Sequence, residues 1–594
     1  MAYDSIPSKI ISNGQKFADK PAYFVRGAAA WEPTSWKTYA AECVQAARAL
    51  ISLGFQPGGT VSILGFNRPE WVILDVAAMC AGGAPAGIYT TCSPTEVQYI
   101  VNHAESSVVL VENKAQWEKI LAKIDELPLL KHVILMKGAE KVEHPIVLTW
   151  DQFMAKAEGT PEKEVHDRIA KLEPQGLATF IYTSGTTGPP KGVMLSHENL
   201  AWTANLAIND IVGGAGPEDC SVSYLPLSHI AEQMFSIHAP ACSGYAVYFA
   251  QGIEKLGDNL KEVQPTIFFG VPRIWEKFHA GVSGKLKEAT GVKAKLVEWA
   301  RGVAIQANAL NMRGEKPSGF LGFQYALANK LIYSKLKPAV GLGRARVCVS
   351  GAAPIGKDVL EFFSSLDLTV LEVYGQSEGS GPTTINRPGR TKLGTVGPAL
   401  PGVTVKIAED GEILVKGPNI FLGYYKEPQA TAETLVDGWL CSGDLGAFDS
   451  DQFLSITGRK KEIIITAGGK NIAPKNLEAA IKQHELVNEA VVIGDRRKFL
   501  IALVTIDPEK GPAWANANGV KPEELATSPA LQKEIQRHID EMNREFAQVE
   551  QIKKFKILPR NFTIADNELT PTLKVKRKKV NESWSKEIEA LYAE

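Results

Sequence analysis

No apolar run in the sequence is long enough to suggest a membrane span. The most apolar window, residues 71–89, contains Asp75 and Pro85 and is rich in alanine and glycine, whereas a membrane-spanning helix needs about 20 strongly apolar residues. We predict a buried helix followed by a strand in this window. The first residues also lack a basic segment followed by an apolar one, so we expect no secretory leader.

An excess of charge of one sign is also missing. The 65 lysines and arginines balance 66 aspartates and glutamates, and the formal net charge is -1, so no global field attracts nucleic acid or an anionic membrane. The seven cysteines are scattered without C-x-x-C spacing, which favours a reduced, intracellular protein. We expect a cytoplasmic protein that binds no nucleic acid, and peripheral contact with a membrane surface stays open.

The first two thirds of the chain have the pattern of an α/β protein. At 594 residues the chain is several times the usual domain size, so we expect more than one domain. Short apolar runs that end in turn residues alternate with helical periodicity, which predicts an α/β sheet. Around Asp410-Gly411, two alternating segments indicate a hairpin in a small β unit. The predicted buried strands lie at 60–67, 106–113, 265–272, 346–354 and 368–375.

The pattern changes again near residue 458. A helical segment at 474–484, a hairpin at 489–507 and charged helices precede a lysine-rich end. We therefore predict a large α/β body of several subdomains with a small β unit over residues 1–457, a hinge at 458–461, and a small, mobile α+β domain over residues 462–594.

A glycine-rich loop, TSGTTGPPKG at residues 183–192, has the composition of a phosphate site. The loop of nucleoside triphosphatases needs lysine directly after its last glycine, but here two prolines separate TSGTTG from Lys191. The chemistry nevertheless remains suitable, because glycines let backbone N–H groups converge on an anion, hydroxyls add donors and the lysine adds charge. By composition alone, the segment is also typical of an ordinary surface turn.

The loop resembles the signature of the AMP-forming adenylate synthetases, the superfamily of acyl-CoA synthetases, peptide-synthetase adenylation domains and firefly luciferase. GVPRIWEK (270–277), YGQSEGSGP (374–382) and the LTPTLKVKR ending are most similar to long-chain and very-long-chain fatty acyl-CoA synthetases, including the bubblegum type. Further segments match superfamily motifs in the same order: YLPLSHIAE (224–232), SGAAP (350–354), VYGQSEGSGP (373–382), GEILVKGPNIFLGYYK (411–426), GWLCSGDLG (438–446), GRKKEIIITAGGKNIAP (458–474) and ELTPTLKVKRK (568–578).

This resemblance implies a two-step reaction. A fatty acid and ATP would give an acyl-adenylate and pyrophosphate, and CoA would then take the acyl group with release of AMP; Mg²⁺ would assist. Two alternatives stay open: an acyl-AMP ligase that loads a carrier protein, and a non-enzymatic protein that binds acyl nucleotides. The sequence leaves the acyl chain length and the oligomeric state open, because pocket depth depends on packing.

The resemblance also implies which residues bind ATP. The loop would cradle the β and γ phosphates, Glu378 would hold Mg²⁺ through its carboxylate, and Tyr374 would offer an aromatic face to adenine. Outside its motif, Glu378 is typical of a solvated turn and Tyr374 of a core residue. The implied ATP ligands are Thr183, Ser184, Gly185, Thr186, Thr187, Gly188, Lys191, Gly351, Ala352, Ala353, Pro354, Tyr374, Gly375, Gln376, Ser377 and Glu378; Thr183, Glu378 and Lys574 are implied to be catalytic.

Asp444 would accept the ribose hydroxyls, Arg459 would also reach the ribose, and Lys461 would be the hinge pivot. Without the motifs, Asp444 is typical of a turn and Arg459 of an exposed linker.

Three more residues complete the implied site. Lys574 would contact the reacting carboxylate and the α-phosphate, Gly469 would leave room for the pantetheine of CoA, and His229 would lie near the acyl pocket. Lys574 also belongs to a basic run, which is usually solvated, and a lone histidine is often structural. Many superfamily members have Gly-Lys where this chain has Leu573-Lys574.

Overall fold

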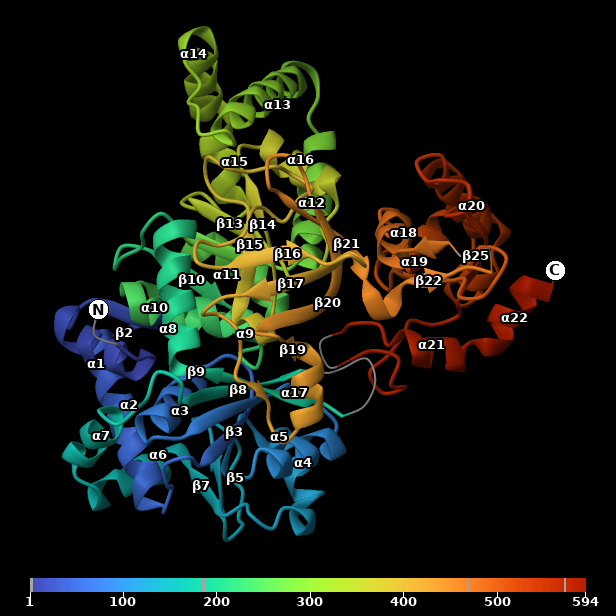
Figure 1. Ribbon diagram of the computed structural model, residues 1–594. Helices are drawn as coiled ribbons and strands as arrows, with labels where there is room; N and C mark the ends of the chain where they lie inside the picture. Colours follow the sequence, from blue (N-terminus) through green and yellow to red (C-terminus); the bar gives the residue numbers. More distant parts are fainter. Residues whose placement is uncertain (1–3, 184–188, 468–469, 571–572, 594) are drawn as a thin grey trace.

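The computed structural model describes residues 4–183, 189–467, 470–570 and 573–593 (Figure 1). The phosphate-loop residues Ser184 to Gly188 and the predicted CoA contact Gly469 lie outside these ranges. Within them, every helix is too short or too polar to cross a bilayer.

The largest sheet has eight strands in the order β18-β9-β8-β4-β3-β5-β6-β7. Its strands from β8 to β7 are parallel, whereas β9 and β18 add antiparallel at one edge. The apolar window 71–89 forms the buried end of α3 (Pro69–Cys80) and then β4, so that prediction is confirmed. The strands are β3 (Thr60–Leu64), β4 (Ala84–Ile88), β5 (Ser106–Val111), β6 (His132–Leu135), β7 (Val147–Thr149), β8 (Leu177–Thr183), β9 (Lys191–Ser196) and β18 (Gly423–Tyr424).

Two four-stranded sheets complete the α/β part of the body. The first, β10-β11-β1-β2, contains β10 (Cys220–Ser223), β11 (Ala246–Phe249), β1 (Pro21–Arg26) and β2 (Trp31–Ser35). The second, β12-β13-β14-β15, contains β12 (Ile267–Gly270), β13 (Val347–Ser350), β14 (Val370–Gln376) and β15 (Gly381–Ile385). All five predicted strands are confirmed, with ends shifted by a few residues.

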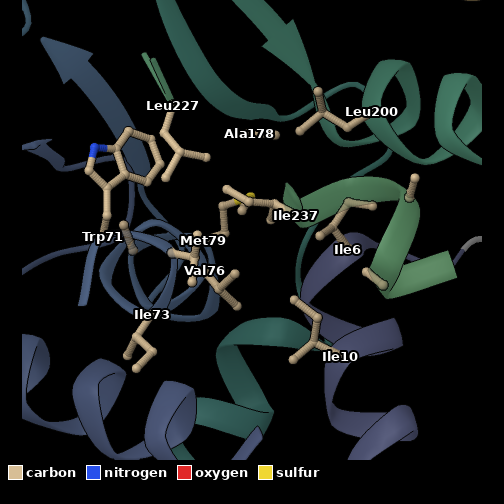
Figure 2. Close-up of a cluster of buried hydrophobic side chains, with 14 of the residues drawn as sticks. Ile6, Ile10, Trp71, Ile73, Val76, Met79, Ala178, Leu200, Leu227 and Ile237 are labelled. Carbon is tan, nitrogen blue, oxygen red and sulfur yellow. The ribbon is translucent and has the colours of Figure 1, made fainter. Parts of the chain in front are cut away.

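Helices of the body pack around several apolar clusters, of which one is the most extended. Ile6 and Ile10 lie one turn apart on α1 (Ile6–Lys16) and face Trp71 and Met79 of α3 and Leu200 of α8 (His197–Leu206) (Figure 2). Burying each such side chain stabilises the fold by about 1.5–3 kcal/mol. Other body helices are α2 (Trp36–Ser52), α4 (Pro94–His103), α5 (Lys114–Leu121), α6 (Trp150–Ala155), α7 (Glu162–Ile169), α9 (Ile230–Gln233), α10 (Ala239–Ser243), α11 (Leu256–Val263), α16 (Lys357–Ser365) and α17 (Pro428–Thr434).

A helical segment between β12 and β13 projects from the body (Figure 1). It consists of α12 (Pro272–Lys287), α13 (Gly291–Asn311), α14 (Gly319–Ala328), the π-helical turn η6 (Asn329–Tyr333) and α15 (Ser334–Ala339).

The strands after residue 400 form the predicted small β unit. β16 and β17 make the hairpin around Asp410-Gly411, with Gly411 at φ +86°. The sheet order is β16-β17-β20-β19, and β21 pairs with the other part of β20. Its strands are β16 (Thr404–Ile407), β17 (Glu412–Lys416), β19 (Leu435–Val436), β20 (Trp439–Phe448) and β21 (Leu454–Arg459).

The C-terminal segment has apolar clusters of its own. Two buried clusters contain only residues from Ile464 onward, whereas the main core ends with Leu454 and the partly buried Ile456. This separation supports the proposed division near residues 458–461, and Figure 1 shows the segment as a separate lobe. Its elements are β22 (Ile464–Ile465), β23 (Asn471–Ile472), α18 (Pro474–Ile481), β24 (Val487–Ile493), β25 (Leu500–Ile506), α19 (Lys510–Ala517), α20 (Pro529–Asn543), β26 (Ile552–Ile557), α21 (Arg577–Ser583) and α22 (Ser585–Ala593).

The glycine-rich loop is followed by the strand β9 and not directly by a helix. Its two flanks form an antiparallel hairpin in which Thr183 on β8 is paired with Lys191 on β9. Val193 and Leu195 are buried while Met194 between them is half-buried, which is the two-residue period of a strand. Helix α8 begins only after Ser196, which caps it.

Candidate active site

One large cavity, of about 2140 Å³, lies between the body and the C-terminal segment. The loops after β13 and β14, the β20–β21 pair and residues 573–575 all contribute to its wall. This is the edge where α/β sheets place ligands, at the carboxyl ends of parallel strands. The predicted site residues that line the cavity are Thr183, Lys191, His229, Ala352, Ala353, Pro354, Tyr374, Gly375, Gln376, Ser377, Glu378, Asp444, Arg459, Lys461 and Lys574.

Gly351 is a predicted ligand that does not line this cavity. A Cβ built at Gly351 would lie 2.5 Å from Cγ1 of Val373, in the neighbouring strand β14. The absence of a side chain therefore lets the end of β13 pack closely against β14. We infer that Gly351 supports the cavity wall from behind.

Glu378 is connected to the phosphate loop through Tyr424. Oε1 of Glu378, just beyond β14, accepts a 2.7 Å hydrogen bond from the Tyr424 hydroxyl. Tyr424 lies on β18, which pairs with β9, and the Lys191 ammonium lies 4.9 Å from the centre of its ring. Tyr424 stands inside a recognised motif, but its spacing from Glu378 in the sequence gave no sign that the two side chains would meet.

Asp444 is held by two other cavity residues. Its Oδ1 lies 3.1 Å from Nε of Arg459, the cross-strand partner on β21, and its Oδ2 accepts a 2.9 Å hydrogen bond from the Tyr374 hydroxyl. Burial raises the pKa of Asp444, while the positive charge of Arg459 acts in the opposite direction. A carboxylate has about four acceptor positions, so Asp444 retains the capacity to accept hydroxyl groups of a ligand.

Lys574 reaches this cavity from the C-terminal segment. Its side chain remains accessible from the cavity. The surrounding protein lowers the pKa of Lys574 because it partly desolvates the ammonium group, and the charges of Arg459 and Lys475 lower that pKa further. Asp444 and Glu462 oppose that effect. Three cations therefore face two carboxylates in one place, and an anionic ligand would relieve the repulsion among the cations.

The backbone before Lys574 explains a departure from the superfamily pattern. Leu573 has a φ of 61°, a left-handed conformation that costs a non-glycine residue about 1–2 kcal/mol. The turn is closed by hydrogen bonds between Thr570 and both Leu573 and Lys574. Glycine, which many superfamily members have at this position, adopts such a φ without a clash.

The first three residues of the predicted hinge, 458–460, still contact the body. β21 pairs with β20 as far as Arg459, and the next residue, Lys460, forms ion pairs of 2.6 Å with Asp410 and 2.8 Å with Glu412. Lys461 follows directly and lines the cavity. The geometry therefore supports a pivot at or just after Lys461, which stays a proposal.

A polar contact also joins the two sides of the cavity. Arg273 of α12 lies 3.5 Å from Oδ2 of Asp507 and donates a 3.3 Å hydrogen bond to Oδ1 of Asn488. The side chain of Arg273 is 46% exposed, so this contact is weak. It was not foreseen, because an exposed arginine carries no sequence signal of its partner.

His229 has a structural contact beside its place in the cavity wall. Its Nδ1 accepts a 3.2 Å hydrogen bond from the N–H of Ala231 and so caps α9. Burial lowers its pKa to about 4, and the charge of Lys574 adds to this effect. The imidazole is therefore neutral near pH 7. The neighbouring wall is apolar and includes Ala207, Ile211, Val212, Ile230, Ala231, Met234, Phe235 and Phe269.

The sequence matches two family models. The model of the AMP-binding enzyme family matches residues 12–425, and that of the AMP-binding enzyme C-terminal domain matches residues 461–594. The chain belongs to the AMP-binding enzyme family.

Curated relatives cover nearly the whole chain. The long-chain-fatty-acid–CoA ligase ACSBG2 of Xenopus laevis is 39% identical over 97% of this chain and 82% of its own length. The long-chain-fatty-acid–CoA ligase FadD15 of Mycobacterium tuberculosis is 37% identical over 95% of this chain and 92% of its own length.

Solved structures share the fold. The adenylation domain of a carboxylic acid reductase from Segniliparus rugosus, in complex with AMP and a carboxylic acid, aligns with a TM-score of 0.76 and 21% identity over 100% of this chain and 95% of that one. The anthranilate CoA ligase AuaEII, with anthranoyl-AMP, aligns with a TM-score of 0.71 and 20% identity over 98% of each chain.

Proposed function

We propose that the protein is a long-chain fatty acid–CoA ligase that forms an acyl-adenylate from a fatty acid and ATP and then transfers the acyl group to CoA. The observation that carries the proposal is that Lys574 of the C-terminal segment meets Asp444 and Arg459 of the body in one cavity with an apolar wall. The ACSBG2 and FadD15 relatives are named long-chain-fatty-acid–CoA ligases, which supports the choice of a long-chain acid.

In the first step, a carboxylate oxygen of the acid attacks the α-phosphate, and the bond to the β-phosphate breaks as pyrophosphate leaves. Thr183 and Lys191 bind the departing phosphates, and Asp444 accepts the ribose hydroxyls. Lys574 offsets the negative charge shared by the carboxylate and the α-phosphate. One such positioned group is worth about 2.7–4 kcal/mol, or about a hundred- to a thousandfold in rate.

Magnesium would accompany ATP. Among the described residues, no group of three or more His, Cys, Asp or Glu side chains is arranged to hold a metal alone. Glu378 nevertheless fits, because Mg²⁺ is usually bound by one or two carboxylates together with waters and phosphate oxygens. The ion would neutralise the charge of the leaving pyrophosphate, while Tyr424 fixes the orientation of Glu378.

In the second step, the CoA sulfur attacks the acyl carbonyl and AMP leaves. Lys574 occupies the cavity in the present arrangement of the two parts. Attack by the thiol therefore needs a different arrangement, in which Lys574 has left the cavity. We propose that residues 462–594 rotate about Lys461 and bring Gly469 to the pantetheine, with residues 1–457 as the fixed body. A cytoplasmic setting suits the seven unpaired cysteines.

The decisive experiment measures AMP release from a series of free acids of increasing chain length, with and without CoA. We expect CoA-dependent AMP release that is fastest with long chains, and ATP–pyrophosphate exchange without CoA. Lys574→Met should abolish the exchange, whereas Lys578→Met, in the same basic run but outside the cavity, should not. Exchange without transfer to CoA would favour a ligase that loads a carrier protein, and absence of exchange would favour a binding protein.

A further inference from the structure

The projecting helix α14 has one face that is fixed to the protein. Leu321, Tyr325 and Ile332 pack with residues of α13 in a small cluster. The Tyr325 hydroxyl also donates a 2.8 Å hydrogen bond to Oδ1 of Asp367 in the body. These contacts determine which side of α14 faces outward.

The outward side of α14 and η6 carries a stripe of large apolar residues. Phe320, Phe323, Leu327 and Leu331 are 75%, 66%, 39% and 36% exposed. Their spacing of three, four and four residues places them on one side of a helix. We call these four residues the α14 stripe. Single exposed apolar residues are ordinary, but a continuous row marks an interaction surface.

Lysines without an ion-pair partner among the described residues lie on and beside the helical segment that carries the α14 stripe. Residues 316–357 contain no aspartate or glutamate, although the whole chain has 66 of them. Lys316, Lys330 and Lys335 are exposed, and none of them forms an ion pair with a residue in the described ranges. The stripe thus lies beside three lysines without an ion pair in the described part of the chain, whereas the acidic residues that adjoin this segment, Glu315 and Asp367, are paired with Arg313 and Lys337.

We propose that the α14 stripe docks on an anionic lipid surface. Phenylalanines and leucines beside unpaired lysines are the composition of helices that lie in the headgroup region of a bilayer. A ten-residue α14 is too short to span the bilayer and is suited to lying in its surface. If two copies of the chain packed stripe against stripe, the lysines of one copy would face the lysines of the other. Charge therefore favours an anionic lipid surface over self-association. This inference goes beyond the proposed reaction and does not depend on it.

Vesicle co-sedimentation tests the proposal directly. The full chain is mixed with phosphatidylcholine vesicles that contain or lack phosphatidylglycerol. We expect at least about tenfold tighter binding to the anionic vesicles, and loss of that difference at high salt. The double variant Phe320→Ser with Phe323→Ser should lose at least about tenfold in binding. Val292→Ser, which changes an 85% exposed residue of α13 outside the stripe, is the matched control.

The lysines need a separate control. We expect Lys316→Ala, Lys330→Ala and Lys335→Ala together to weaken binding to anionic vesicles by about tenfold or more. The same three changes at the exposed Lys114, Lys171 and Lys498 should leave it unchanged.

Failure of the wild-type chain to bind anionic vesicles would overturn the proposal, as would equal binding by the stripe variant. Light scattering without vesicles tests the other occupant, a second copy of the chain. Self-association of the wild-type chain that the stripe variant loses would overturn the lipid proposal in favour of an interface between copies. Melting temperature and ATP–pyrophosphate exchange, both expected to be unchanged, establish that the variants fold.

Discussion

Asp444 and Lys191 should affect nucleotide binding in different ways. ATP, ADP and AMP share the ribose that Asp444 is proposed to bind, so Asp444→Asn should weaken all three by the same factor. Lys191 is proposed to contact only the β and γ phosphates. We therefore expect Lys191→Met to weaken ATP strongly and to leave AMP unchanged. This pair of variants tests the orientation of the nucleotide in the cavity.

The magnitude follows from the contacts of Asp444. A hydrogen bond to a charged group contributes about 1.5–3 kcal/mol, and asparagine keeps one acceptor oxygen, so we expect a loss of about 2 kcal/mol, or about thirtyfold in Kd. The ion pair with Arg459 adds little to the stability of the free protein, because that side chain is 45% exposed. Burial raises the pKa of Asp444, so removing the charge also relieves a desolvation cost. The melting temperature should therefore change little.

Isothermal titration calorimetry with the three nucleotides at fixed Mg²⁺ measures these effects. Asp451→Asn is the matched control, since that side chain is 67% exposed and lies outside the cavity. Two results would refute the reasoning: wild-type affinity of Asp444→Asn for AMP, or an equal loss of ATP and AMP binding in Lys191→Met.

Three further predictions concern metal binding, pH and domain orientation. Tyr424→Phe removes the hydroxyl that holds Glu378 and should raise the Mg²⁺ concentration needed for half-maximal ATP–pyrophosphate exchange by about tenfold; an unchanged Mg²⁺ dependence would contradict this role. Because the pKa of Lys574 is lowered, kcat/KM for adenylate formation should fall with rising pH before an ordinary lysine loses its proton, and Lys574→Arg should remove that fall if Lys574 is its source. Arg273→Ala removes the contact with Asp507 and should slow single-turnover adenylate formation about two- to fivefold, with no loss in acyl-CoA formation from preformed adenylate; equal slowing of both steps would argue against an orienting role.

The buried strands were predictable because they are continuous apolar runs bounded by turn residues, as strands covered on both faces are. The runs at 60–67 and 106–113 became β3 and β5 in the middle of the eight-stranded sheet. β9 was missed because its six residues follow a loop whose composition indicates only turns. Its identity as a strand comes from pairing with β8, which sequence periodicity over so short a segment does not specify.

Every predicted site residue that the structure describes, except Gly351, lines the cavity, but the contacts among these residues were not predicted. Tyr374 and Asp444 are 70 residues apart, and their hydrogen bond exists because the fold brings both residues to the wall of the same cavity. The positive φ of Leu573 was also not predictable from the sequence, because leucine rarely adopts such a conformation. Gly351 shows the converse: its motif was recognised, but its lack of a side chain serves strand packing. Sequence identifies residue types for a site, whereas tertiary packing decides their partners.

The way the two parts of the protein meet favours movement between them. The C-terminal segment keeps its own apolar clusters, so a rotation need not expose the main core. The link from Arg273 to Asp507 is a partly exposed ion pair, worth about 1 kcal/mol or less. By contrast, backbone pairing of β21 with β20 holds the chain to the body as far as Arg459, and Lys460 adds partly exposed ion pairs with Asp410 and Glu412. A paired strand end, a weak polar contact and separate cores are the features expected of a hinge, and they support the proposal that Lys574 leaves the cavity between the two steps.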